Sequence, residues 1–361
     1  VKHKMMTSSI PKERITHLDT ARGLAVMGIL LINSISFFID GLAVYQINRP
    51  ESQSRLDWWI AAFGEVFVDQ KFMGLFSLLF GASFLLFLER VQDQTERPAI
   101  LSLWRNVLLL AIGIFHGALW PGDILFIYAT CVPILFLFRH ASWRFLCLLG
   151  LLLYYGSTIF SFWMTPHLNG ELLESLIRTT PGSEAADLMG AFFIADTYFR
   201  AVGMMLVGMG LYRNGWLKRT GDANLRVFAW GAIVLGALIS GCGVFWVDVQ
   251  DYAPQALLMG NVPNTFATPW VSLGYLTLIM IWDAAAEGIW VERIRSMGRM
   301  ALTNYLGQTL FCLSLAALLP PGFTSRSGVL VTVVVIWVLQ LFGSHAWLTR
   351  YRLGPIEWLW R

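Results

Sequence analysis

The feature that most constrains this chain is a series of apolar runs, each about 20 residues long, which is the length of helix that crosses a bilayer. Short segments between the runs hold most of the charges. The runs are continuous rather than alternating, which argues against strands and a membrane barrel. With 56% hydrophobic and 14% charged residues, this pattern predicts an all-α polytopic transmembrane bundle.

We expect a single transmembrane domain over residues 1–361 with about ten spans. It includes a cytoplasmic N-terminal segment at 1–20, an extracytoplasmic cap loop at 165–190 and a cytoplasmic C-terminal segment at 348–361. The segment 56–70 is expected to be an interfacial amphipathic helix, with a partial span that leads into the second helix as the alternative. Another outside loop is expected at 248–266. No cleavable signal peptide is evident, so the first span is expected to remain as an anchor. The spans are placed at 21–39, 72–91, 101–118, 123–139, 143–164, 191–212, 225–247, 267–286, 297–319 and 328–347.

The lysines and arginines predict the orientation of these spans. When both termini are placed in the cytoplasm, 20 of the 26 basic residues fall on that side. This bias follows the positive-inside rule and argues against an eleventh span at 56–70. The net charge of +3 is therefore a topology signal, and no nucleic-acid partner is expected. The basic residues left outside are Arg49, Arg55, Lys71, Arg178, Arg200 and Arg326.

His116 is the most informative single residue, because it lies inside an apolar run and Asp123 follows seven positions later. Ionisable groups within a membrane are costly unless a partner or a wet cavity supports them. Imidazole exchanges protons near neutral pH, and a neighbouring carboxylate can orient it. The pair is therefore a candidate general base, with a structural hydrogen bond that closes a helical hairpin as the alternative.

Arginines at the inner ends of three spans form a second candidate feature. Arg22, Arg105 and Arg299 could surround a basic mouth that binds phosphate, provided that they converge in space; positive-inside anchoring explains each one equally well. Asp19 shares a helical face with Arg22 and can cap the first span. Asn33 can hydrogen-bond a neighbouring helix.

Charges at the outer ends of two spans complete the candidates. Lys71 enters the second span from outside and either snorkels to the interface or faces a cavity. Asp196 and Arg200 are four residues apart and predict an intrahelical ion pair that faces the bundle interior.

Several common chemistries leave no motif in this chain. It has no glycine-rich phosphate loop with its lysine, no His-Glu-x-x-His and no Gly-x-Ser-x-Gly. The four cysteines fit neither a disulfide framework nor a zinc site, and we expect no metal. They are Cys131, Cys147, Cys242 and Cys312.

Five segments, in order along essentially the whole chain, resemble the bacterial YeiB family, which is catalogued as a domain of unknown function. That family is distantly similar to transmembrane acyltransferases of the heparan-glucosaminide N-acetyltransferase and acyltransferase-3 types, through an Asp-x-x-Arg-Gly opening. The segments are Leu18–Gly23, Lys71–Gly81, His116–Gly117 with Gly122–Leu125 and Tyr128–Ala129, Gly298–Leu306 and Gly354–Arg361.

The resemblance implies a bacterial inner-membrane, multi-pass acyltransferase. It would move an acyl group from cytoplasmic acyl-CoA, with acetyl-CoA as the first candidate, to a small-molecule, glycan or lipid acceptor. His116 would be the base or acyl relay and Asp123 would orient it. Arg22, Arg105 and Arg299 would attract the CoA phosphates. Asn304 or Tyr305 would supply an oxyanion donor if they reach the same cavity.

Two other functions remain open at this point. A transporter or lipid flippase would use Lys71, His116, Asp123, Asp196 and Arg200 as a polar pathway, although no inverted repeat is visible. A non-catalytic membrane scaffold would use the same groups to fix helix packing. Membrane lipids are expected partners in each case, and small-residue faces on the sixth and seventh spans could support a homodimer.

Overall fold

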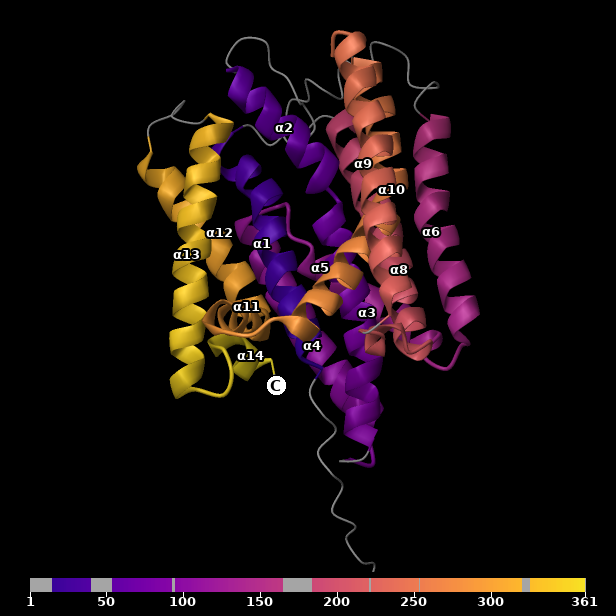
Figure 1. Cartoon of the computed structure of the whole chain (residues 1–361), viewed down its shortest axis with the longest axis vertical. Coiled ribbons are helices and arrows are strands. Elements are labelled where there is room, and N and C mark those ends of the chain that lie inside the picture. Colours follow the sequence, from indigo (N-terminus) through magenta and orange to yellow (C-terminus); the bar gives the residue numbers. More distant parts are fainter. Residues whose placement is uncertain are drawn as a thin grey trace, which may run out of the picture.

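The computed structural model describes residues 15–39, 54–92, 95–164, 184–220, 222–252, 254–319 and 325–360, and the elements in these ranges are helices (Figure 1). Eight helical stretches there are long and apolar enough to cross a membrane, with Arg55–Gln92 counted as one. The prediction of an all-α transmembrane bundle is therefore confirmed. The number of crossings and the side of each terminus stay predictions.

The helices are α1 (Thr16–Phe38), α2 (Arg55–Phe67), α3 (Lys71–Gln92), α4 (Pro98–Leu119), α5 (Leu125–Leu137), α6 (Trp143–Met164), α8 (Glu184–Arg213), α9 (Ala223–Val249), α10 (Pro254–Ala285), α11 (Ile289–Arg299), α12 (Ala301–Leu318), α13 (Arg326–Arg350) and α14 (Pro355–Leu359), with a 3-10 turn at Trp216–Lys218. Each of the ten expected spans overlaps one of these helices. The segment 56–70 overlaps α2. The cap loop expected at 165–190 lies outside the described residues up to 183, and α8 begins at Glu184.

One expected loop is wrong. The segment 248–266 was expected to lie outside the membrane as a loop, but α10 begins at Pro254 and continues through it. The polar residues that give this segment the composition of a loop instead bond residues 69–71, at and just before the start of α3. Asn264 bonds Lys71 and the carboxylate of Asp69, and Asn261 accepts a hydrogen bond from Gln70 at 2.7 Å. Such contacts make polar residues compatible with a helix in the bundle.

The centre of the bundle is formed by α1 and α3, with α12 and α13 on one side and α8, α9 and α10 on the other (Figure 1). Glycines permit a close crossing between α3 and α8. A Cβ at Gly81 would lie 1.9 Å from the carbonyl oxygen of Met205, and one at Gly208 would lie 2.0 Å from that of Leu78. The two backbones are therefore in direct contact at this point.

The hairpin of α4 and α5 places the candidate base. The chain turns between Trp120 and Ile124, and a Cβ at Gly113 would lie 2.5 Å from the backbone nitrogen of Phe126. This close approach brings the end of α4 against the start of α5. His116 and Asp123 therefore face each other across the turn.

The ninth expected span, 297–319, is interrupted at Met300, where α11 ends and α12 begins. Charged and apolar residues alternate along α11 with helical periodicity, as in a helix that lies along the end of a bundle. Met300 N donates to the carbonyls of both Ser296 and Met297, at 3.2 Å each. The break turns α11 across α1 and places Arg299 beside the first helix of the bundle.

Candidate functional site

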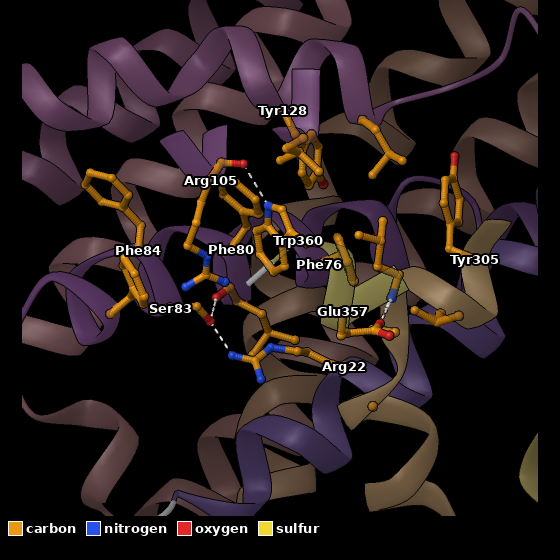
Figure 2. A pocket seen from close by; sticks show the side chains of 18 of the residues that line it. Arg22, Phe76, Phe80, Ser83, Phe84, Arg105, Tyr128, Tyr305, Glu357 and Trp360 are labelled. Atoms are coloured by element: carbon orange, nitrogen blue, oxygen red, sulfur yellow. Dashed lines mark hydrogen bonds between the residues drawn. The ribbon is translucent and has the colours of Figure 1, made fainter. Parts of the chain in front are cut away.

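A cavity of about 360 Å³ lies between α1, α3, α4, α5 and α12 (Figure 2). It begins at the end of the bundle that the positive-inside rule predicts to be cytoplasmic and reaches inward to Tyr128 and Tyr305. We call it the arginine cavity, because four arginines line it: Arg22, Arg90, Arg105 and Arg299. The three arginines that the sequence marked as a basic mouth therefore converge on one space.

Arg22 and Arg299 make hydrogen bonds to residues beside the cavity. Arg22 pairs with Asp19 at 2.9 Å and donates to the hydroxyl of Ser83 on α3 at 2.5 Å. Arg299 donates to the carbonyl of Arg352 at 3.2 Å. The Nε atom of Arg90 is buried and has no hydrogen-bond partner among the described residues.

Arg105 lies between two aromatic rings. Its guanidinium carbon is 4.0 Å from the ring centroid of Phe87 and 4.1 Å from that of Trp360. Such stacking fixes the plane of a guanidinium while its edges can still donate hydrogen bonds. Asp19 and Glu357 are the acidic residues on the wall. Four arginines against two carboxylates leave the wall with two excess positive charges, which attract anions.

The last residues of the chain close one side of the arginine cavity (Figure 2). The carboxylate of Glu357 accepts hydrogen bonds from the backbone N–H groups of Leu302 and Thr303, at 2.8 and 3.0 Å, at the start of α12. It thereby satisfies amides that have no partner within the helix. The indole of Trp360 donates to the carbonyl of Arg105 at 2.8 Å. The C-terminal segment is thus part of the wall.

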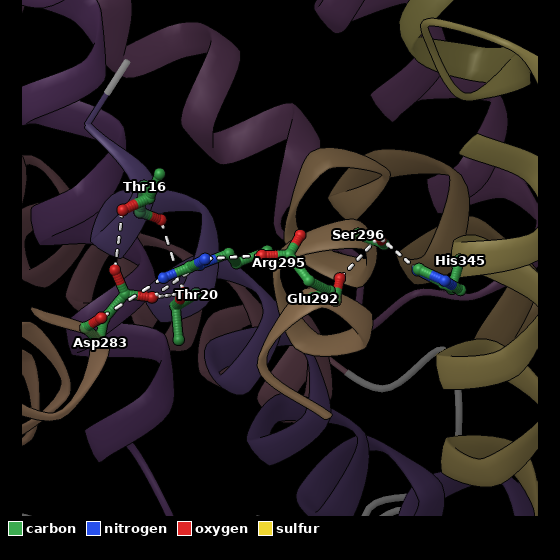
Figure 3. A network of polar contacts seen from close by, with 7 residues as sticks. All are labelled: Thr16, Thr20, Asp283, Glu292, Arg295, Ser296 and His345. Atoms are coloured by element: carbon green, nitrogen blue, oxygen red, sulfur yellow. Dashed lines mark hydrogen bonds and ion pairs between the residues drawn. The ribbon is translucent and has the colours of Figure 1, made fainter. Parts of the chain in front are cut away.

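A polar network fastens α11 to α1 and α10 at the same end of the bundle (Figure 3). The carboxylate of Asp283 accepts from Thr16 at 2.8 Å, from Thr20, and from Arg295 at 3.0 Å. The hydrogen bond to Asp283 raises the pKa of Arg295 above its ordinary value, so the guanidinium stays charged. Arg295 also bonds Glu292 at 2.7 Å. This network holds α11 in the position that brings Arg299 to the cavity.

At the deep end, four side chains form a continuous hydrogen-bonded chain. His116 Nδ1 lies 2.8 Å from Asp123 Oδ1, and its Nε2 lies 2.9 Å from the hydroxyl of Thr309. The hydroxyl of Tyr305 donates to the same Asp123 oxygen at 3.3 Å. The other Asp123 oxygen accepts from the backbone N–H of Phe126 at 3.2 Å. The pairing of His116 with Asp123 that the sequence suggested is therefore present.

His116 does not line the arginine cavity. Its side chain is 2% exposed, and its ring centroid is 5.3 Å from that of Tyr305, which does line the cavity. Tyr305 therefore stands between the cavity and the imidazole. The arrangement connects an arginine-rich entrance to a buried acid–base pair through one tyrosine hydroxyl.

Asn304 and Asn33 lie elsewhere. Asn304 is adjacent to Tyr305, but on a helix neighbouring residues point in different directions. It faces α13, where it donates to Ser344 at 2.9 Å, and also donates to the Met297 carbonyl at 3.1 Å. Asn33 is half-buried on α1, away from the cavity wall. Of the two oxyanion donors suggested by the sequence, only Tyr305 reaches the cavity.

The charged residues at the outer end form a separate cluster. Lys71 is fully buried and donates to the Glu65 carbonyl at 2.6 Å and to Asn264. Arg200 pairs with Asp196 at 2.6 Å and donates to the Gln70 side chain at 2.6 Å. The predicted intrahelical ion pair is therefore present. Lys71 on α3 and Arg200 on α8 each bond a side chain of α10, Asn264 and Thr265 respectively, and none of these residues lines the arginine cavity.

Four residues of the site were not singled out from the sequence. Arg90 and Thr309 look like an end-of-span arginine and an ordinary polar residue within an apolar helix. Glu357 and Trp360 lie in a terminal segment that contributed to the family resemblance, but their roles depend on the chain folding back. Only the i, i+4 spacing of Tyr305 and Thr309, which places them on one face of α12, was readable in advance.

The chain is similar to a protein family model and to several bacterial proteins. A family model described as a protein of unknown function, DUF418, matches residues 211–361. The uncharacterized protein YeiB of Escherichia coli K12 is 32% identical over 97% of this chain and 96% of its own length. The chain belongs to the YeiB family.

Two further members of similar length match from end to end. The uncharacterized protein YxaH of Bacillus subtilis is 28% identical over 98% of this chain and 94% of its own length. An uncharacterized 39.9 kDa protein of Bacillus acidopullulyticus is 28% identical over 97% and 93%. No solved structure matches this chain.

The segments that carry the resemblance to the YeiB family gather around one site. The first contributes Arg22, the fourth contributes Arg299 and Tyr305, and the last contributes Glu357 and Trp360 to the wall of the arginine cavity. The segment after Lys71 supplies the apolar wall through Phe76 and Phe80 (Figure 2), and the His116–Asp123 pair lies behind the deep wall.

Proposed function

We propose that this chain is an acyltransferase of the bacterial inner membrane that transfers the acyl group of a cytoplasmic acyl-CoA to an acceptor within or across the bilayer. The observation that carries this proposal is the meeting of Arg22, Arg105 and Arg299 in one cavity whose deep wall, at Tyr305, bonds to the buried Asp123. A phosphate-bearing thioester needs both parts: cations at the entrance and acid–base groups at the far end.

The entrance suits phosphate. Guanidinium groups bind phosphate oxygens through paired N–H donors, and the stacking of Arg105 between Phe87 and Trp360 fixes the plane of its guanidinium at the cavity wall. The excess positive charge of the wall attracts the nucleotide part of CoA from the cytoplasm. A volume of about 360 Å³ is within the usual range for ligand pockets, and the nucleotide would remain at the mouth.

The deep end suits an acyl chain and its thioester. Phe76, Phe80 and Leu109 give it apolar walls, while Tyr305 offers a hydroxyl. A hydroxyl aimed at a carbonyl oxygen stabilises the negative charge that develops there during acyl transfer. His116, with Nδ1 on Asp123, is arranged as a general base, a role that typically contributes about 10²–10⁴-fold to the rate.

Thermal unfolding of the purified protein with acetyl-CoA, palmitoyl-CoA and free CoA tests donor binding. At one hundred times its dissociation constant, a ligand stabilises the folded state by about 2.7 kcal/mol. We expect the thioesters to raise the unfolding midpoint of the wild-type protein. This shift should be smaller in Arg299→Gln and in Arg22→Gln. Arg226→Gln is the matched control, because Arg226 is exposed on α9 and lies outside the cavity. No shift with any CoA species in the wild-type protein would contradict the proposal.

The outer cluster bears on the transporter alternative. A transport path needs charged groups that can change partners, whereas Asp196 and Arg200 bond each other and Lys71 is bonded within its own cluster. We therefore assign these residues to helix packing. Reconstituted vesicles provide the check, because a transporter would accumulate a solute in the absence of any thioester.

A further inference from the structure

We propose that Thr309 is the nucleophile that first receives the acyl group, so that transfer proceeds in two steps through an acyl-threonine ester. This inference rests on the proposed acyltransferase function and deepens it. Its basis is the line of three side chains Asp123, His116 and Thr309, which has the connectivity of a nucleophilic catalytic triad.

The hydrogen bonds around Asp123 indicate which atom is the donor and which the acceptor along the Asp123–His116–Thr309 triad. Asp123 accepts from Tyr305 and from the Phe126 amide, so its oxygens act as acceptors and Nδ1 of His116 is the donor towards it. A neutral imidazole then carries its lone pair on Nε2. The hydroxyl of Thr309, 2.9 Å away, donates to that lone pair. The base is therefore already placed on the proton that must leave.

The surroundings favour this role over that of a solvated hydroxyl. Thr309 and His116 are each 2% exposed, and the rings of Trp120 and Tyr305 lie against the imidazole with centroids 6.2 and 5.3 Å away. Excluding water strengthens the electrostatic interactions among these groups and protects an ester from hydrolysis.

Tyr305 provides the route from the arginine cavity to Thr309. The two residues lie one helical turn apart on the same face of α12, and Tyr305 is on the cavity wall. Its hydroxyl bonds Asp123 at 3.3 Å, which is a long hydrogen bond. Rotation of this side chain as the thioester enters would expose the Thr309 hydroxyl to the thioester carbonyl.

The two steps balance. In the first, Thr309 Oγ1 forms a bond to the thioester carbonyl carbon, its proton passes to His116 Nε2, and the carbon–sulfur bond breaks. The proton then moves to the sulfur, which releases CoA as its thiol. In the second, an acceptor hydroxyl or amine gives its proton to His116 Nε2 and takes the acyl group, and Thr309 regains its proton.

The position of Thr309 explains why a two-step route suits a membrane enzyme. Thr309 is the ninth of the 18 residues of α12. At a rise of 1.5 Å per residue, it lies about 12 Å from the start of this helix and about 14 Å from its end. An acyl group held there is nearly equidistant from the two ends of α12, so a donor and an acceptor that approach from opposite ends can use the site at different times.

The test is acylation of the full chain in the absence of acceptor, in two parallel arms. One arm uses acetyl-CoA, and the other uses p-nitrophenyl acetate, which needs no CoA site. After acid quenching and proteolysis, tandem mass spectrometry locates acetyl groups by residue. We expect acetyl at position 309 in the wild-type protein and in Thr309→Ser, and its loss in Thr309→Val. In His116→Gln the rate of labelling falls by about 10²–10⁴-fold.

Thr158→Val is the matched control, because Thr158 is equally buried but bonds only its own helix, through the Tyr154 carbonyl. It should keep the label on Thr309. Unmodified Thr309 in both arms, in protein that is folded by its unfolding transition, overturns the inference. If acetyl-CoA still stabilises that protein, direct transfer from donor to acceptor remains and the proposed function stands. Labelling by the p-nitrophenyl ester alone supports the nucleophile and counts against CoA as the donor.

Discussion

Gly298 and Gly23 lie against each other where α11 crosses α1. A Cβ at Gly298 would lie 2.8 Å from the backbone nitrogen of Gly23 and 1.7 Å from the carbonyl oxygen of Asp19. Each glycine is adjacent in sequence to an arginine of the cavity, Arg22 or Arg299. The backbone contact therefore sets the separation of these two arginines, and neither glycine can carry a side chain without moving a helix.

Replacing Gly298 by alanine should loosen this crossing. Overpacking of a closely packed contact typically costs about 1–3 kcal/mol, and here the obstacle is backbone. We expect Gly298→Ala to lower the free energy of unfolding by at least this amount and to weaken acyl-CoA binding, as measured by thermal unfolding with and without ligand.

Gly231→Ala is the comparison for this experiment, since Gly231 on α9 has open space around its Cβ position. Alanine in a helix is favoured over glycine by about 0.5–1 kcal/mol, so this variant should be as stable as the parent or more stable. Equal stability of Gly298→Ala and the parent would contradict the close crossing.

Removing the carboxylate of Glu357 should destabilise the start of α12. Leu302 N and Thr303 N would lose their acceptor. An unsatisfied buried donor costs about 1–3 kcal/mol, and because these amides are half-buried we expect a cost near the lower end of this range. We expect Glu357→Ala to lower the unfolding midpoint and to free the C-terminal segment for proteolysis. Glu287→Ala changes an exposed carboxylate and should alter stability by no more than about 0.5 kcal/mol. Similar behaviour of the two variants would show that the C-terminal segment does not brace this helix.

The network of Asp283 offers a comparison within a single cluster. Asp283→Asn keeps the shape of the side chain but removes the charge that faces Arg295, so the guanidinium loses its buried partner. We expect a loss of about 1–3 kcal/mol of unfolding free energy. Glu292, whose side chain is 54% accessible, is the exposed partner of the same arginine. Its replacement in Glu292→Gln should cost less than about 1 kcal/mol of unfolding free energy. High salt should reduce the smaller effect and leave most of the larger one.

The helical class of this protein was predictable because hydrophobic length is a local property of the sequence. The failure at α10 has an equally physical cause. The segment 248–266 has the composition of a loop, whereas the polar side chains of Asn261 and Asn264 bond Gln70 and Asp69 in the turn between α2 and α3. Hydropathy within a short stretch of sequence cannot show a hydrogen-bond partner that lies nearly two hundred residues away.

In the candidate site, too, a contact between residues close in sequence was predictable and contacts between distant helices were not. The pairing of His116 with Asp123 was predictable because seven residues and one turn separate them. The contact of His116 with Thr309 joins residues 193 positions apart and depends on how α4 packs beside α12. The position of Tyr305 in front of the imidazole likewise follows from packing alone.

The pairing of His116 with Asp123 predicts strong non-additivity between substitutions at these two positions. His116→Ala leaves a buried carboxylate without its imidazole, and removing one partner of a buried pair typically costs about 3–5 kcal/mol. Asp123→Ala leaves Nδ1 without its acceptor. The double variant leaves neither group without its partner, so its loss of unfolding free energy should be smaller than the sum of the single losses, with a coupling of about 0.5–3 kcal/mol.

Unfolding of the four proteins in one detergent measures this double-mutant cycle. His140→Ala, at an exposed histidine, should combine additively with Asp123→Ala. Additivity in both cycles would mean that the imidazole and the carboxylate do not depend on each other, and the triad would then lose the residue that orients its base.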